Sequence, residues 1–180
     1  MVAIILGTGF EPIETLTPCD ILRRGGVEVC MASVSGSIVE GGHGIRVQAD
    51  CMNDEVDPEQ LEMVVLPGGL GGVNSILASQ KALDLVKTVY ENGKFVAAIC
   101  AAPTILAKLS ITDGKKATCY PGMEEQMGKA LMQPMAVVRD GSVITGRAAG
   151  AAEEFGLELL AELRGRETAD AVAKAIVSRV

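Results

Sequence analysis

The sequence predicts an α/β fold, in which a mainly parallel sheet is covered by helices on both faces. Short apolar runs rich in Val, Ile and Ala alternate along the chain with longer segments that carry apolar residues at helical spacing. These runs are hydrophobic nearly throughout, as is typical of strands buried on both faces of a parallel sheet. The 180 residues contain no Pro- or Ser-rich linker and no repeat, so we expect one domain spanning residues 1–180.

In the first part of the chain, the patterns predict strands at residues 2–6, 27–34 and 63–66. A helix is expected at residues 14–24, where Leu and Ile recur at helical spacing before Gly25-Gly26 ends the segment. Two short extended pieces within residues 37–50 flank a Gly-rich turn and predict a hairpin.

In the second part, helices are expected at residues 80–92 and 101–109, with a strand at residues 95–99 between them. Residues 116–120 are expected to be extended and residues 122–131 helical. Residues 136–139 and 142–145 form a hairpin across Asp140-Gly141, a dipeptide typical of two-residue turns. Helices at residues 151–163 and 167–179 close the chain.

Composition and charge exclude several classes of function. Sixteen basic against 23 acidic residues give a net charge of −7, so binding to a nucleic-acid backbone is not expected. The N-terminus lacks a basic region and no apolar run approaches membrane-spanning length, so we expect neither a signal peptide nor a membrane-spanning segment. Five cysteines without a CxxC pair, and a single His43, predict a cytoplasmic protein with free thiols, no metal and no cofactor.

Cys100 is the first candidate for chemistry. It stands where the predicted strand at residues 95–99 runs directly into a helix, so a sharp turn should lift its side chain above the sheet with a positive φ. A thiol at a helix N-terminus is expected to have a pKa below about 7, because the helix dipole favours the thiolate. The alternative is a buried, inert cysteine.

Two further features lie at the same edge of the predicted sheet. Pro67-Gly68-Gly69 ends a strand, and glycines there let backbone N–H groups approach a ligand; the alternative is an ordinary turn. Glu14 follows the first strand and could meet Cys100, where burial beside a thiolate would raise its pKa and make it a proton donor. The alternative for Glu14 is an acid that the helix dipole favours.

Together these segments resemble the ThiJ/PfpI superfamily, and most closely the branch of the parkinsonism-associated protein deglycase and its bacterial relatives. The resemblance is carried by Gly9-Phe-Glu-Pro-Ile-Glu14, Leu66-Pro-Gly-Gly69 and Ala97-Ala-Ile-Cys100-Ala-Ala-Pro103, in the family's order and spacing. It covers nearly the whole chain. Thr145-Gly-Arg147 resembles a further family segment more loosely.

The resemblance implies a flavodoxin-like three-layer sandwich and a homodimer. It also implies that Cys100 is an easily oxidised nucleophile, and that Glu14 is the protonated acid hydrogen-bonded to it. The backbone N–H groups of Gly69 and Ala101, beside Gly68, would form an oxyanion site.

Three further residues are possible substrate or anion contacts by resemblance. Arg24 would lie near the dimer interface, and His43 at a position where the family often carries a basic residue facing the partner's site. The chain has Tyr120-Pro121 where family members often carry a His-Pro step. Without that His, a Cys–His dyad is not available. A Tyr hydroxyl cannot replace it as a base, because its pKa lies far above neutral pH.

We therefore expect a deglycase- or glyoxalase-like enzyme acting on small aldehydes or on groups glycated by methylglyoxal or glyoxal. The main alternative is a redox sensor or stress chaperone that signals through oxidation of Cys100. An amidase or protease of the superfamily ranks below both.

Overall fold

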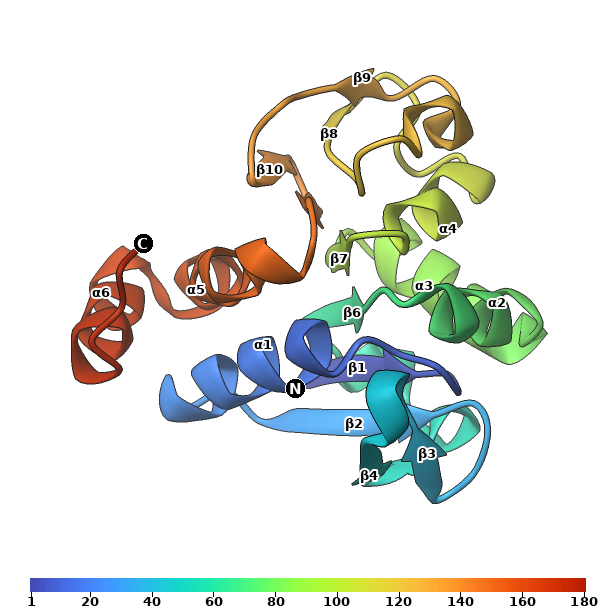
Figure 1. The fold of residues 1–180 in the computed structure, drawn as a ribbon, viewed down its shortest axis with the longest axis horizontal. Helices are drawn as coiled ribbons and strands as arrows, with labels where there is room; N and C mark the ends of the chain where they lie inside the picture. Colours follow the sequence, from blue (N-terminus) through green and yellow to red (C-terminus); the bar gives the residue numbers. More distant parts are fainter.

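The computed structural model describes residues 1–180 and is built on a seven-stranded sheet in the order β10-β11-β7-β6-β1-β2-β5 (Figure 1). All neighbouring strands are parallel except β10 and β11, which form the predicted antiparallel hairpin. The strands are β1 (Val2–Leu6), β2 (Val29–Ser33), β5 (Cys51–Met52), β6 (Met63–Leu66), β7 (Phe95–Ile99), β10 (Val137–Asp140) and β11 (Val143–Gly146).

Helices cover both faces of this sheet (Figure 1). The helices α1 (Pro12–Arg24), α5 (Ala152–Arg164) and α6 (Arg166–Ala175) lie on one side. The helices α2 (Leu70–Leu77), α3 (Gln80–Glu91) and α4 (Pro103–Lys108) lie on the other. The predicted three-layer α/β sandwich is confirmed, and the parallel strands follow the flavodoxin-like order, with the sheet changing direction between β1 and β6.

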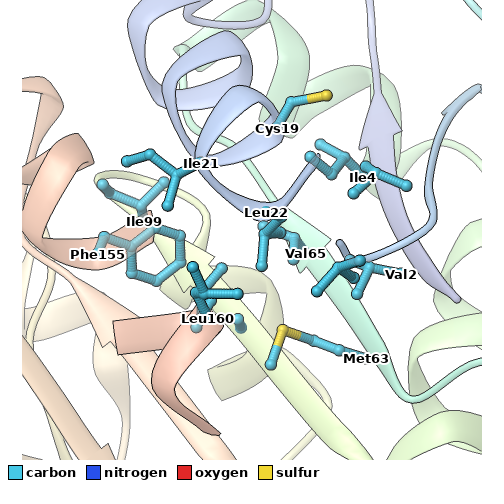
Figure 2. Packing of buried hydrophobic residues seen from close by; sticks show 14 of the residues in the cluster. Val2, Ile4, Cys19, Ile21, Leu22, Met63, Val65, Ile99, Phe155 and Leu160 are labelled. Atoms are coloured by element: carbon cyan, nitrogen blue, oxygen red, sulfur yellow. The ribbon is translucent and has the colours of Figure 1, made fainter. Parts of the chain in front are cut away.

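Alternate residues of each buried strand supply the two cores. On the α1 and α5 side, Ile4 and Val65 of the sheet pack against Leu22 of α1 and against Phe155 and Leu160 of α5 (Figure 2). The opposite face of the same strands packs against α2, α3 and α4. Because each strand is buried on both sides, its sequence is apolar throughout rather than alternating.

Two small sheets complete the fold. The hairpin predicted within residues 37–50 is present as β3 (Ile38–Glu40) and β4 (Arg46–Gln48). The segment expected to be extended at residues 116–120 contains β8 (Lys116–Ala117), which pairs with β9 (Leu131–Met132). No helix in the structure is both long enough and apolar enough to cross a membrane.

Some boundaries differ from the sequence prediction. The expected helix at residues 122–131 is wrong: only the 3₁₀ turn Glu124–Met127 forms before β9. The helix expected to begin at Ala101 begins at Pro103, since Cys100 to Ala102 form a turn. The helix α2 and the edge strand β5 were not predicted, because α2 begins Leu70-Gly71-Gly72, a poor helical sequence, and β5 has only two residues.

Candidate active site

Cys100 lies at the sharp connection between β7 and α4, with a φ of 66°. The predicted positive φ is therefore confirmed. The turn is held from two sides, because the Cys100 N–H donates to the carbonyl of Gly146 at 2.9 Å and its carbonyl accepts from the Tyr120 N–H at 2.8 Å. Such strain persists only where the surroundings fix it, and it is concentrated at functional sites.

Glu14 reaches Cys100 from α1. Its side chain is only 1% exposed, and its carboxyl is hydrogen-bonded to the Cys100 thiol. The N–H of Gly68, directly after β6, donates to Oε2 of Glu14 at 2.9 Å. A Cβ added at Gly68 would lie 2.7 Å from Cβ of Cys100 and 3.1 Å from its sulfur. Glycine at this position lets the carboxyl and the thiol meet.

Two backbone N–H groups point at the sulfur. They belong to Gly69 and Ala101, and both hydrogen bonds lower the pKa of the Cys100 thiol. Gly69 has a φ of 83°, and a Cβ there would lie 2.8 Å from the backbone nitrogen of Glu11, so only glycine fits. The donors of this cradle thus come from the connections after β6 and β7.

Burial has the largest effect on the pKa values of Glu14 and Cys100. It raises the pKa of Glu14 from 4.5 to about 7, against the hydrogen bonds from Cys100 and Gly68. Burial also raises the pKa of the Cys100 thiol from 9.0 to about 12, and the negative charge of Glu14 and the hydrogen bond to it act in the same direction. The pair therefore loses its first proton near pH 7 and holds its remaining proton between carboxyl and sulfur above that pH.

The expectation that Cys100 itself has a lowered pKa is thus wrong. The helix α4 begins at Pro103, three residues beyond the thiol, and is only six residues long. So short a helix has a weak dipole, and its N-terminal end lies away from the sulfur. Together with the two N–H donors, it does not outweigh the loss of solvation and the neighbouring carboxylate.

Above the pair lies a cavity of about 640 Å³. Its lining residues come from the connections after β1, β6, β7 and β11 and from the loop that follows β8: Glu11, Glu14, Gly69, Leu70, Cys100, Ala101, Tyr120, Pro121, Gly122, Met123, Gln126, Ala148, Ala149 and Gly150. Two of these residues are acidic and none is basic, so the cavity favours neutral or cationic molecules over anions.

Of the three remaining candidate residues from the sequence, only one lines this cavity. Tyr120 lines it, with its side chain 48% exposed. Arg24 does not; it is exposed at the end of α1 and pairs with Asp20 at 2.6 Å. His43 does not either; it is exposed in the turn between β3 and β4, with a φ of 60°. The structure brings together Cys100, Glu14, Gly68, Gly69, Ala101 and Tyr120.

Several wall residues of the cavity were not singled out from the sequence, among them Leu70, Met123 and Gln126. Leu70 begins the unpredicted helix α2, and its exposed side chain borders the site. Met123 and Gln126 come from the irregular segment that we expected to be helical. No local pattern marks these residues, because α2 has a poor helical sequence and the segment around Met123 and Gln126 forms only a 3₁₀ turn.

Comparison with known proteins agrees with this geometry. A model of the DJ-1/PfpI family matches residues 1–162. The protein dj-1beta of Drosophila melanogaster is 38% identical over 177 residues, which cover 97% of this chain and 95% of that protein. Its crystal structure matches with a TM-score of 0.95, covering 99% of this chain and 98% of that chain at 37% identity.

Two other relatives also match over most of their own length. A protein named a deglycase from Pyrococcus abyssi is 33% identical over 151 residues, which cover 83% of this chain and 90% of that protein. The Parkinson disease protein 7 homolog of Danio rerio is 32% identical over 179 residues, with 97% of this chain and 95% of that protein covered. The chain belongs to the DJ-1/PfpI family.

Proposed function

We propose that this protein is a cysteine-dependent deglycase or glyoxalase that acts on methylglyoxal, glyoxal or their adducts. The observation that carries the proposal is the hydrogen-bonded contact between the Cys100 thiol and the buried Glu14 carboxyl beneath the cavity. A nucleophile and a proton carrier in direct hydrogen-bond contact are the minimum equipment for addition to a carbonyl group followed by proton transfer.

The proposed reaction begins when the Cys100 sulfur adds to the aldehyde carbon and Glu14 delivers the shared proton to the carbonyl oxygen. This step gives a hemithioacetal and leaves Glu14 as a carboxylate. Glu14 then removes the proton bound to that carbon and returns it to the neighbouring carbon, while the hydroxyl proton moves from the first oxygen to the second. The product is a thioester of a 2-hydroxy acid, and water hydrolyses it to the free acid and regenerates the thiol. Methylglyoxal plus water thus gives a hydroxy acid without any oxidant or reductant.

The lining of the cavity supports this class of substrate. Leu70, Pro121 and Met123 supply apolar walls, and no basic side chain is present to hold an anion. A small neutral dicarbonyl fits such a lining. So does the adduct of a dicarbonyl with an amino or guanidino group, whose nitrogen can remain beside Glu11.

Relatives support the same direction, since two members of the family from Pyrococcus species are named deglycases. A second candidate function, redox sensing through Cys100, is favoured by the cradle of N–H and carboxyl groups that would also hold an oxidised sulfur. One similar structure, at 30% identity, is the Toxoplasma gondii DJ-1 in oxidized form. An amidase or protease has no support from the cavity, where no histidine is present.

Turnover of methylglyoxal tests the proposal. Cys100→Ser should lower kcat/KM at least about 10³-fold, because a hydroxyl is a far weaker nucleophile. Glu14→Gln should lower it by about 10²–10⁴-fold, because the amide still donates to sulfur but cannot carry a proton. Tyr120→Phe should cost less than about tenfold.

Cys51→Ser is the matched control, because Cys51 is also half-buried and lies outside the cavity. It should leave turnover unchanged. A wild-type protein that turns over no dicarbonyl, yet is oxidised by peroxide selectively at Cys100, would favour the sensor instead. A larger loss in Tyr120→Phe than in Glu14→Gln would make Tyr120 the acid–base group.

A further inference from the structure

A second pair of sulfur atoms lies away from the active site. The sulfur of Cys30, on β2, is 2.7 Å from the sulfur of Cys51, on the edge strand β5. Both side chains are half-buried and pack against the core on the α2 and α3 side of the sheet. Neither residue lines the cavity above Cys100.

The backbone around this pair is already fixed. In the parallel pairing of β2 with β5, Cys51 of β5 lies opposite Ala32 of β2. Cys30 lies two residues before Ala32 on β2, so its side chain points to the same face of the sheet as those of Ala32 and Cys51. The N–H of Asp50 donates to the carbonyl of Met31 at 2.8 Å, and the carboxyl of Asp50 accepts from the Met31 N–H at 2.8 Å. Arg23 holds the same carboxyl at 3.0 Å. The two sulfur atoms are therefore already adjacent in the folded chain, and a disulfide of about 2.05 Å needs only a small further approach.

We propose that Cys30 and Cys51 form a second redox site, at which a small hydroperoxide converts the two thiols reversibly into an intramolecular disulfide. In the first step, the sulfur of Cys51 attacks the peroxide oxygen, giving a sulfenic acid on Cys51 and releasing the alcohol, or water from hydrogen peroxide. In the second step, the sulfur of Cys30 attacks that of Cys51, and the hydroxyl leaves as water with the proton of Cys30. Two thiols are oxidised by two electrons, and one peroxide is reduced.

The order of the two steps follows from the environment of Cys30. Burial, together with the adjacent Cys51, raises the pKa of Cys30 to about 12, so Cys30 is the weaker first nucleophile. Cys51 stands in the two-residue strand at the edge of the sheet, which no further strand covers. Cys51 is therefore the sulfur that meets the oxidant, and Cys30 is the resolving thiol that prevents further oxidation.

The disulfide would tie the edge strand β5 covalently to β2. The two strands share only two register pairs, Ala32 with Cys51 and Ser33 with Met52. The loop that the bond closes also contains the β3–β4 hairpin. Closing a loop of this size should raise the Tm of the oxidised protein by about 5–10 °C.

Peptide mapping tests the proposal on the intact protein. Each cysteine of the pair falls in its own tryptic peptide, Cys30 in residues 25–46 and Cys51 in residues 47–81, with no other cysteine in either. After treatment with hydrogen peroxide and blocking of free thiols, digestion without reductant should yield these two peptides linked. Dithiothreitol should separate them and restore two thiols that can be alkylated.

Three comparisons make the result decisive. Cys19→Ala, which removes a thiol with no sulfur partner, should leave the linked peptides intact, and Cys51→Ser should abolish both them and the rise in Tm. Cys100→Ser should form the linkage as readily as the wild type, which separates this site from the active site. The proposal is overturned if Cys30 and Cys51 remain fully alkylatable, if either goes to a sulfinate without linkage, or if the linkage joins two different chains.

Discussion

Cys100 keeps a left-handed backbone conformation because Gly146 and Tyr120 bind its two backbone polar groups. A non-glycine residue in that region costs on the order of 1–3 kcal/mol, which the surrounding hydrogen bonds offset. The same turn brings the thiol against Glu14, the most deeply buried acidic side chain of the protein. The backbone strain at Cys100, the burial of Glu14 and the hydrogen bond between them thus all arise from the same turn.

Burial of Glu14 makes stability depend on pH. The pKa of Glu14 is raised from 4.5 to about 7 in the folded protein, so the folded state binds more protons than the unfolded state between these values. The free energy of unfolding should therefore fall as pH rises through this window, by at most about 3 kcal/mol from this group.

Urea unfolding of the wild type and of Glu14→Gln at pH 4.5 and 7.5 measures this contribution. The stability of the wild type relative to the variant should decrease with rising pH, since glutamine does not titrate. The thiol of Cys100 titrates above this window and does not contribute to the difference. A difference between the two proteins that stays constant with pH would show that folding does not raise the pKa of Glu14.

At the level of single residues, the sequence was enough to find Cys100 and Glu14 but not to predict how the thiol ionises. Both positions follow from short motifs at the ends of strands. The pKa of the thiol depends on how much solvent the neighbouring loops exclude. Leu70 reaches the site from a helix that was not predicted, and Met123 from a segment wrongly predicted to be helical. A local sequence pattern does not show how deeply segments distant in the sequence bury the thiol.

At the level of elements, the site exists because three βα connections meet at one edge of the sheet. Glu14 follows β1, Gly68 follows β6 and Cys100 follows β7, and these strands are neighbours in the order β7-β6-β1. The sheet reverses its direction of growth between β1 and β6, the point at which ligands usually bind in folds of this type. The connection after β6 lies between the other two.

Gly68→Ala tests the role of that central connection. The added methyl group would contact Oε2 of Glu14 and lie 2.7 Å from Cβ of Cys100, so carboxyl and thiol must separate. We expect a loss of about 1–3 kcal/mol in the free energy of unfolding and a loss of turnover greater than that loss of stability explains. Gly42→Ala is the control for glycine replacement, because Gly42, like Gly68, has no positive φ and the nearest atom to its added methyl lies 3.6 Å away. Wild-type turnover in Gly68→Ala would contradict the close approach.

The apolar runs predicted most of the central strands, since strands buried on both faces are hydrophobic throughout. The elements that escaped prediction are stabilised by tertiary contacts instead. The helix α2 contains Gly71 and Gly72, which lie against the backbone of Gly9 and Phe10, and β5 is held by its pairing with β2. Neither contact leaves a periodic pattern in the sequence.

At the level of the whole molecule, we propose a homodimer that forms through exposed apolar side chains of two adjoining elements. The helix α1 exposes Ile13 and Leu16, and the β3–β4 hairpin exposes Ile38 and Ile45. The hairpin adjoins the start of α1, where the N–H of Gly42 donates to the carbonyl of Phe10 at 2.8 Å. Exposed apolar side chains gathered on adjoining elements are typical of an interface between protein chains.

We expect sedimentation at micromolar concentration to give the mass of two chains. Leu16→Asp should weaken this association at least about tenfold, because it places a charge in the patch. Leu131→Asp is the matched control, since Leu131 is also exposed but lies outside α1 and the hairpin. A monomeric wild type, or equal effects of the two variants, would count against this interface.

The central claim is that Cys100 and Glu14 share one proton at neutral pH, and the rate of Cys100 alkylation against pH tests it most directly. Iodoacetamide labelling can be followed on the tryptic peptide of residues 95–108, in which Cys100 is the only cysteine. In the wild type, the rate should rise with an apparent pKa near 7 and then stay level to about pH 9. In Glu14→Gln, burial alone sets the ionisation of the thiol, so the inflection should move upward by at least about one pH unit. An inflection in Glu14→Gln at or below that of the wild type would contradict the shared proton.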